Sequence, residues 1–361
     1  MIRKRDAVRG ALLGLAVGDA MGNTVDGRNL EEIRRDYGPN GLLGYDLANG
    51  GADITSYTQL AAFCANGLLL GLTRGRQAPL ENYVAVALRE WSRSQYYCKP
   101  ERNYCWLSGK PTVKRRRCMD TRMLDVLNQG KFGTMEQPTQ RSNHPSALTE
   151  AVSVALLQEE LKLSREETDR LGASVVALTH GDPEAFLSGA VLTHGLTELM
   201  LSPDAPAETV LRGTMDAVQM AFGSCYGQTT HIWELLQMAM TLASSDSIRQ
   251  WDAMERLGCR TAAEVLAGAL YAVVTCGGDF DAAMITAVNH SGRSAAVGAM
   301  TGAILGVKLG CAALPDFYLE SLEPLDVLTE LADDITQGCP AGNTGFLFDD
   351  DWDRKYRGGG F

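Results

Sequence analysis

One stretch near the C-terminal end of the chain, AVNHSGRSAAVGAMTGAILG at residues 287–306, constrains the fold more than any other. Its second half places very small residues at helical spacing, namely Ala299, Gly302, Ala303 and Gly306. One face of such a helix has almost no side-chain volume, so it can pack very closely against a neighbour. The first half, residues 289–294, predicts a polar turn that presents the free backbone N–H groups of the helix N-terminus. The stretch therefore predicts a closely packed helix with a candidate binding site at its start.

The rest of the chain also has helical patterns, and we find neither an alternating strand pattern nor a repeat of fixed period. We therefore expect an all-α fold, with a single domain over residues 1–361 and an irregular, insertion-like loop region at about residues 94–145. The first helix is expected to end in GDAMGNTVDG, because Gly18, Gly22 and Gly27 would break it and bring Asp19 near Asp26. The predicted helices span residues 1–20, 31–37, 53–70, 80–94, 120–128, 146–162, 164–179, 183–200, 207–222, 229–243, 261–275, 281–288, 295–309 and 325–335.

The balance of charges argues against two classes of partner. Lys and Arg number 33 while Asp and Glu number 44, so the formal net charge is −11. We therefore expect no nucleic-acid partner and no membrane partner, and we interpret the basic, aromatic-rich residues 94–141 as a solvated loop. No segment at the start resembles a signal peptide, and no run reaches the roughly 20 apolar residues of a membrane span. These observations predict a cytoplasmic protein.

The nine cysteines are an odd number and form no C-x-x-C pair. Cys98, Cys105 and Cys118 share the irregular region, but their spacing does not match a zinc module. We interpret the cysteines as reduced thiols, as is usual for a cytoplasmic protein.

Several segments together resemble the ADP-ribosylglycohydrolase family. They are RGALLGLAVGDAMGNTVDG at residues 9–27, ALTHGDPEAFLSGAVLTHGL at 177–196, LGCRTAAEVLAGALYAVV at 257–274, AVGAMTGAILG at 296–306, EPLDVLTELADDI at 323–335, and the late Trp352 and Tyr356. They follow one another in the family's order over nearly the whole chain. The resemblance implies a compact orthogonal multi-helix bundle and a cleft for ADP-ribose.

The resemblance also implies two magnesium ions, held by a Thr-Asp-Asp-Thr motif and a Gly-Gly-Asp-Thr-Asp-Thr motif. This sequence has Thr55-Ser56-Tyr57-Thr58 at the first motif and Ser291-Gly292-Arg293-Ser294-Ala295-Ala296 at the second. Four aspartates are therefore replaced and a cation is gained. Because magnesium needs oxygen ligands and negative charge, we expect no bound metal and no cofactor.

A second GGDxD segment, Gly277 to Asp281, could be taken for the metal motif. It does not lead directly into the small-residue helix, however. We interpret Asp279 as the N-cap of the helix predicted at residues 281–288.

Further site residues follow from the resemblance. Asp26 is the candidate catalytic residue, because it matches an acidic residue that orients a metal ion or water. Glu150 replaces an arginine and would repel a diphosphate. In the segment 141–146, His144, Pro145 and Ser146 replace the glycines of a phosphate-binding loop. Asp19 and Asp26 could instead serve their turns, and His180 could satisfy the backbone carbonyls at a helix end. The candidate ligand-binding residues are Asp19, Thr55, Ser56, Tyr57, Thr58, Ser142, His180, Asn289, Ser291, Gly292, Arg293 and Ser294.

Three functions remain open at this point. The first is a non-catalytic pseudoenzyme that binds ADP-ribose, a related nucleotide or a protein, with Arg293 in the space of a metal and paired with Asp26 or Asp53. The second is a metal-independent hydrolase of N- or O-glycosidic ADP-ribosyl bonds, with Asp26 as general base and Arg293 as electrostatic helper. The third is a structural or assembly protein, because a fold alone does not determine function.

Overall fold

Helices make up the regular structure of the chain in a computed structural model that describes residues 2–47, 50–96, 104–117, 119–227, 229, 231–245, 247–340 and 349–357. Over these residues one isolated parallel bridge, Ala52 to Leu322, is the only β feature, so the predicted all-α class is confirmed. Cys98 and Cys118 of the irregular region lie outside the described residues. The helices are α1 (Ile2–Asn23), α2 (Leu30–Tyr37), α3 (Ser56–Thr73), α4 (Leu80–Gln95), η1 (Trp106–Gly109), α5 (Pro111–Lys114), α6 (Thr121–Gln129), η2 (Pro145–Ala147), α7 (Leu148–Leu156), α8 (Gln158–Leu161), α9 (Arg165–Ala177), α10 (Pro183–Leu201), α11 (Ala207–Tyr226), α12 (His231–Ala243), α13 (Gln250–Leu257), α14 (Ala262–Thr275), α15 (Phe280–Val288), α16 (Ser294–Leu309), η3 (Cys311–Ala313), α17 (Asp316–Glu320), α18 (Leu325–Gln337) and α20 (Asp350–Tyr356).

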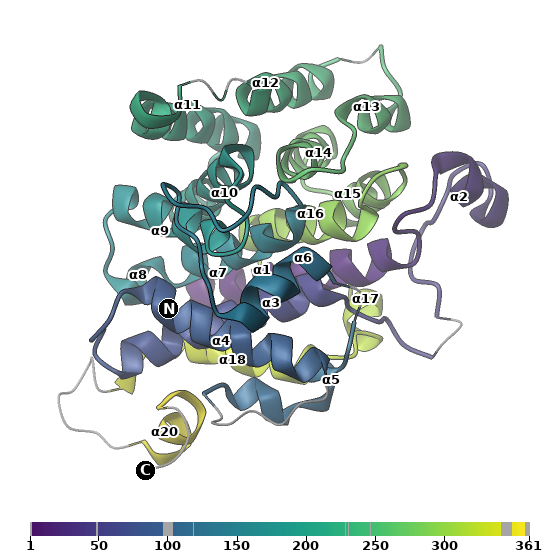
Figure 1. Cartoon of the computed structure of the whole chain (residues 1–361). Helices are drawn as coiled ribbons and strands as arrows, with labels where there is room; N and C mark the ends of the chain where they lie inside the picture. The colour runs from purple at the N-terminus through teal and green to yellow at the C-terminus, as the bar shows by residue number, and fades with distance from the viewer. Residues whose placement is uncertain are drawn as a thin grey trace.

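The centre of the molecule is formed by α1, α3, α7 and α16. In Figure 1, α11, α12 and α13 make up one end, α18 and α20 lie toward the opposite end, and α2 projects at the side. Buried apolar side chains from Val8 on α1 to Tyr356 on α20 belong to one connected core. No described helix is both long enough and apolar enough to cross a membrane.

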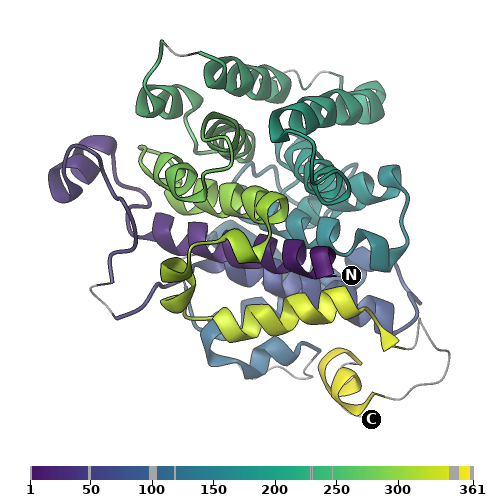
Figure 2. The same ribbon diagram turned by 180° about the vertical axis from the view of Figure 1, so that it is seen from behind.

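The small-residue helix α16 packs along α1, as Figure 2 shows from behind. Four glycines of α1 face α16 in antiparallel order, and their partners are Gly306, Gly302, Gly298 and Ser294. A Cβ added to Gly302 would lie 1.9 Å from the carbonyl oxygen of Gly14, and one added to Gly14 would lie 2.2 Å from the carbonyl oxygen of Gly302. The two backbones therefore touch directly, which only glycine permits.

The predicted end of the first helix was wrong. We expected the glycines to break it near residue 20, but α1 continues through Gly18 and Gly22 to Asn23. A Cβ on Gly18 would lie 1.9 Å from the carbonyl oxygen of Gly298. The glycines are thus contact residues, and the close packing offsets their weak helix propensity of about 1 kcal/mol each.

Local signals placed several helix starts correctly and missed the shortest helices. Asp279 accepts a hydrogen bond from the backbone N–H of Ala282 (3.0 Å), which confirms it as the N-cap of α15. Thr55 caps α3, and Ser164 with Glu167 forms a capping box at the start of α9. The missed α-helices include α5, α13, α17 and α20, which have 4, 8, 5 and 7 residues, so each offers only about one to two helical turns in which a period could show.

Glu150 lies in the core and does not face a ligand. It is fully buried on α7, and neither carboxyl oxygen has a hydrogen-bond partner among the described residues. The expectation that Glu150 would repel a bound diphosphate is therefore wrong. Burial raises the pKa of this carboxyl well above its usual value, so the folded protein holds it protonated to a higher pH than the unfolded chain does.

Because of this buried carboxyl, the free energy of unfolding should fall as the pH rises. Between the unfolded pKa and the raised folded pKa, folding takes up one proton, so the free energy of unfolding drops by about 1.4 kcal/mol per pH unit. Glu150→Gln removes the titration, so we expect a variant that is more stable than the wild type at pH 8 and whose advantage shrinks toward pH 5. Urea unfolding at both pH values measures this.

Glu166→Gln on α9 is the matched control, because that carboxylate is largely exposed and is solvated in both states. Its difference from the wild type should not widen with pH. A Glu150→Gln difference that is the same at pH 5 and pH 8 would contradict the buried, protonated state.

Candidate functional site

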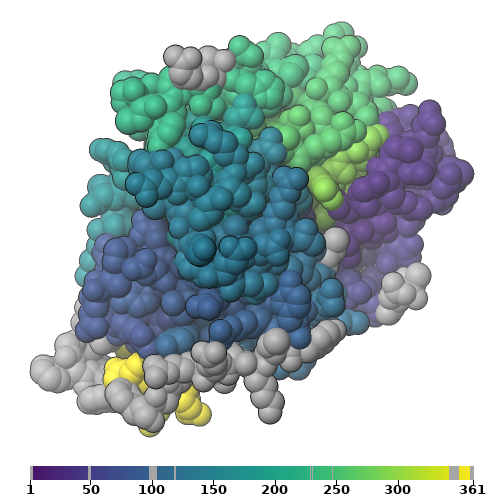
Figure 3. Space-filling view, viewed as in Figure 1, coloured from purple at the N-terminus to yellow at the C-terminus, as the bar shows by residue number. Residues whose placement is uncertain are grey.

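A cavity of about 330 Å³ lies where the N-termini of α3 and α16 meet the start of α6 and the turn before η2. Figure 3 shows the surface hollow where the purple, blue and lime parts of the chain come together. The cavity brings together the two segments that the family resemblance assigned to metal binding. Two other cavities, of about 250 and 790 Å³, contain no predicted site residue in their linings. The residues that line the cavity of about 330 Å³ are Asn23, Asp26, Thr55, Ser56, Tyr57, Met119, Asp120, Thr121, His144, Arg293 and Ala295.

Asp19 holds the start of α3 from within the core. Its Oδ1 accepts a hydrogen bond from the Thr55 hydroxyl (2.6 Å). Its Oδ2 accepts from the Thr55 N–H (2.8 Å), the Thr58 N–H (3.1 Å) and the Thr58 hydroxyl (2.6 Å). Burial raises the pKa of Asp19 to about 6, although the hydrogen bonds act in the opposite direction. Both oxygens of Asp19 are thus bonded to residues at the start of α3. This favours a structural role for Asp19 over direct contact with a ligand.

Arg293 and Asp26 meet at the start of α16. Arg293 Nη1 lies 3.8 Å from Asp26 Oδ2, with the arginine side chain 44% exposed and the aspartate 21% exposed. Asp26 Oδ1 accepts a hydrogen bond from the Ala295 N–H (3.1 Å) and so caps the helix. Burial raises the pKa of Asp26, against the effects of that bond and of Arg293. Of the two predicted partners of Arg293, the structure pairs it with Asp26, whereas Asp53 pairs with Arg117 (3.0 Å).

The neighbouring polar residues of the turn before α16 fasten it to the fold. Asn289 accepts a hydrogen bond from the Leu42 N–H (2.7 Å) and donates to the Leu42 carbonyl (2.9 Å). Ser291 accepts from the Leu30 N–H (2.9 Å), and a Cβ on Gly292 would lie 2.4 Å from the Cys259 carbonyl oxygen. None of these three predicted ligand-binding residues lines the cavity.

Two further candidates are buried outside the lining. Ser294 is fully buried, and its hydroxyl has no hydrogen-bond partner among the described residues. Ser142 accepts a hydrogen bond from the His144 N–H (3.3 Å) and so shapes the turn before η2. Of the predicted ligand-binding residues, those in the cavity wall are Thr55, Ser56, Tyr57 and Arg293.

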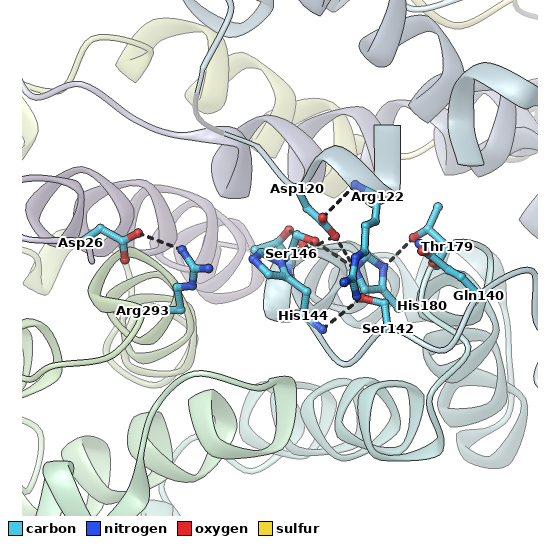
Figure 4. A network of polar contacts seen from close by, with 11 residues as sticks. Asp26, Asp120, Arg122, Gln140, Ser142, His144, Ser146, Thr179, His180 and Arg293 are labelled. Atoms are coloured by element: carbon cyan, nitrogen blue, oxygen red, sulfur yellow. Dashed lines mark hydrogen bonds and ion pairs between the residues drawn. The ribbon is translucent and has the colours of Figure 1, made fainter. Parts of the chain in front are cut away.

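A cluster beside Arg293 contains His180, together with two residues that the sequence analysis did not select as site residues (Figure 4). His180 Nε2 lies 3.2 Å from Asp120 Oδ2, and His144 Nδ1 lies 3.8 Å from the same oxygen. Burial lowers the pKa of His144 to about 4. Although burial alone would raise the pKa of Asp120, its bond to His180 holds that pKa below the usual value. These three side chains could hold a metal ion, since their donor atoms lie within 4.8 Å of one another.

Ser146 adds a hydroxyl to the cluster without forming a serine-hydrolase relay. Its Oγ lies 3.1 Å from His180 Nε2, the same nitrogen that contacts Asp120. The other nitrogen of His180, Nδ1, lies 2.8 Å from the Thr179 hydroxyl. A relay needs the serine and the carboxylate on opposite ring nitrogens, so this arrangement is not one.

No local sequence signal joins the members of this cluster. Asp120 and His180 are 60 residues apart and come from the cap of α6 and the turn after α9. His144 comes from a third segment, just before η2. The only sequence sign for Asp120 was its place at the start of a predicted helix, which indicates an N-cap and no ligand.

Comparisons with known proteins show the family and the fold of this chain. A sequence model of the ADP-ribosylglycohydrolase family matches residues 1–344. Among the solved structures that match, one described as an "ADP-ribosylglycohydrolase-related protein complex" has a TM-score of 0.56 and 21% sequence identity, over 93% of this chain and 99% of that one. At that identity the likeness shows the fold alone. A search of curated proteins gave no match.

Proposed function

Because this chain belongs to the ADP-ribosylglycohydrolase family, we propose that its cavity binds an ADP-ribosyl group or a related nucleotide and does not hydrolyse it with two magnesium ions. The observation that carries the proposal is Arg293, whose partly exposed guanidinium lies in the cavity wall at the start of α16. A guanidinium offers paired N–H donors that match the oxygens of a phosphate. A nucleotide diphosphate is therefore the part of the ligand that Arg293 would contact.

The residues of the cavity do not fit two magnesium ions. The family's four aspartate positions hold Ser56, Tyr57, Arg293 and Ala295, and all four residues line the cavity. Asp26, which also lines it, already caps α16 and faces the guanidinium of Arg293. Two divalent ions need several carboxylates to offset their charge, and a guanidinium adds positive charge instead. We derive no reaction step through magnesium.

The hydrolase alternative depends on Asp26 as a general base, and its surroundings favour binding over hydrolysis. One of its oxygens accepts from the Ala295 N–H and the other faces Arg293. These contacts occupy both oxygens that would have to take the proton of an attacking water, although burial raises the pKa of Asp26. A product assay on ADP-ribosylated arginine decides between the two functions, and we expect the substrate to remain intact.

Arg293→Ala should weaken the binding of ADP-ribose by about 10- to 100-fold, because it removes a charge-assisted hydrogen bond of about 1.5–3 kcal/mol. Calorimetric titration with ADP-ribose and with AMP measures the affinity, first with Mg²⁺ and then with a chelator. We expect the affinity to be the same in both conditions.

Arg249→Ala is the matched control, since Arg249 is exposed, pairs with Asp252 next to α13 and lies outside the cavity. It should bind as the wild type does. Binding that requires Mg²⁺, or an Arg293→Ala affinity equal to that of the wild type, would refute the proposal.

A further inference from the structure

We infer that Asp120, His144 and His180 form a binding site for one divalent transition-metal ion, with Zn²⁺ as the ion whose preferences match the donors. The inference depends on these three side chains and their supports, and no step of it uses the proposed nucleotide. One carboxylate oxygen and two imidazole nitrogens are donors that zinc accepts readily. Magnesium prefers oxygen ligands, so this site should discriminate against it.

The three donor atoms converge on one point. Asp120 Oδ2 lies 3.2 Å from His180 Nε2 and 3.8 Å from His144 Nδ1. All three atoms lie within 4.8 Å of one another. In tetrahedral zinc sites with bonds of about 2.0–2.1 Å, two ligands are roughly 3.3 Å apart. His144 Nδ1 also accepts a hydrogen bond from the Ser146 N–H (3.2 Å), so receiving the ion requires this ring to turn from that N–H toward the ion.

Asp120 and His180 are each held by a contact on the side away from the cluster, as Figure 4 shows. Asp120 Oδ1 accepts a hydrogen bond from the Arg122 N–H (3.0 Å), which leaves Oδ2 toward the histidines. His180 Nδ1 lies 2.8 Å from the Thr179 hydroxyl, a contact that fixes the ring and aims Nε2 at Asp120. Such outer contacts orient histidine ligands in metal sites.

The site opens to the cavity on one side. Asp120 and His144 line the cavity, and the side chain of His144 is 26% exposed whereas that of His180 is fully buried. The Ser146 Oγ lies 3.1 Å from both His144 Nδ1 and His180 Nε2, so it closes another side. Three protein ligands with access from the cavity leave a fourth position for water.

The charge of Arg293 should affect zinc binding and nucleotide binding in opposite directions. Its guanidinium lines the same cavity as Asp120 and His144, so its positive charge opposes a bound cation. Arg293→Ala should therefore strengthen zinc binding while it weakens nucleotide binding. The two proposals thus respond in opposite directions to one substitution.

The test is a calorimetric titration of the full chain with ZnCl₂, supported by the absorption spectrum of added Co²⁺. We expect one ion per chain in the wild type and an affinity about 100-fold lower in Asp120→Asn, since removing a contact to a ligand alone costs about 10- to 100-fold. Asparagine is as good an N-cap as aspartate, so α6 should remain intact and the metal-free Tm should hardly change. At one zinc concentration, the ion should raise the Tm of the wild type more than that of Asp120→Asn.

His231→Gln is the control, because His231 is exposed on α12 and pairs only with Glu184 in the described part of the chain. It should bind zinc as the wild type does, and the cysteines are the same in every variant. Less than one zinc ion per chain in the wild type, or equal zinc affinity in Asp120→Asn, would overturn the inference. Loss of nucleotide binding with zinc binding intact would refute only the proposed function.

Discussion

Gly302→Ala should destabilise the protein by about 3 kcal/mol, although alanine is the better helix former. The added methyl group would lie 1.9 Å from the carbonyl oxygen of Gly14, so α1 and α16 would have to move apart. Overpacking of this kind costs about 1–3 kcal/mol, and here the clash is with backbone, which cannot rotate away. The start of α16 carries Arg293, so the shift should also disturb the cavity. Urea unfolding of the full chain measures the loss.

The matched control is the same substitution at Gly213. This glycine lies within α11, and a Cβ added to it meets nothing within 4 Å. There the propensity of alanine acts alone, so we expect Gly213→Ala to gain about 0.5–1 kcal/mol. If both substitutions change stability by the same amount and sign, direct backbone contact between α1 and α16 does not limit the fold.

Asp19→Ala is the second large effect, with an expected loss of at least about 3 kcal/mol at pH 4, where Asp19 is protonated in the folded wild type. It leaves the backbone N–H groups of Thr55 and Thr58 buried without their acceptor, and each unsatisfied group costs about 1–3 kcal/mol. It also empties a buried volume between α1 and α3. Urea unfolding measures the loss, and a change below 1 kcal/mol would show that Asp19 does not hold the start of α3.

Asp19→Asn should be far milder, because it resembles the protonated acid. With its amide oxygen at the Oδ2 position it still accepts the three hydrogen bonds made there, and its NH₂ group can donate to the Thr55 hydroxyl. The pKa of Asp19 is raised to about 6 from 3.8, so its contribution to stability is full below pH 3.8 and is lost as pH rises through 6. Relative to the asparagine variant, the wild type should lose about 3 kcal/mol between pH 4 and pH 7. A constant difference over that range would exclude the raised pKa.

The sequence could predict those parts of the site that consist of consecutive residues in one motif. The segments 55–58 and 291–296 were compared with known motifs position by position, and the structure brings residues from both into one cavity. Asn289 and Ser291 lie outside the cavity lining and accept hydrogen bonds from the backbone of Leu42 and Leu30. A polar group in a turn can serve a ligand or the backbone, so the sequence could not place them. The Asp120, His144 and His180 cluster could not be foreseen, because three separate segments supply it.

The sequence by itself determined the helical class and most helix starts, and it predicted the loss of the family's magnesium ligands. These features depend on neighbours in the chain: the spacing of apolar residues, the caps, and the identity of residues at motif positions. Tertiary structure alone decided that Gly18 and Gly22 extend α1, that Glu150 is buried and that Arg293 pairs with Asp26. A glycine can break a helix or admit another backbone, and a carboxylate can face water or the core. The physical difference lies in what packs against each residue, and distant segments supply that.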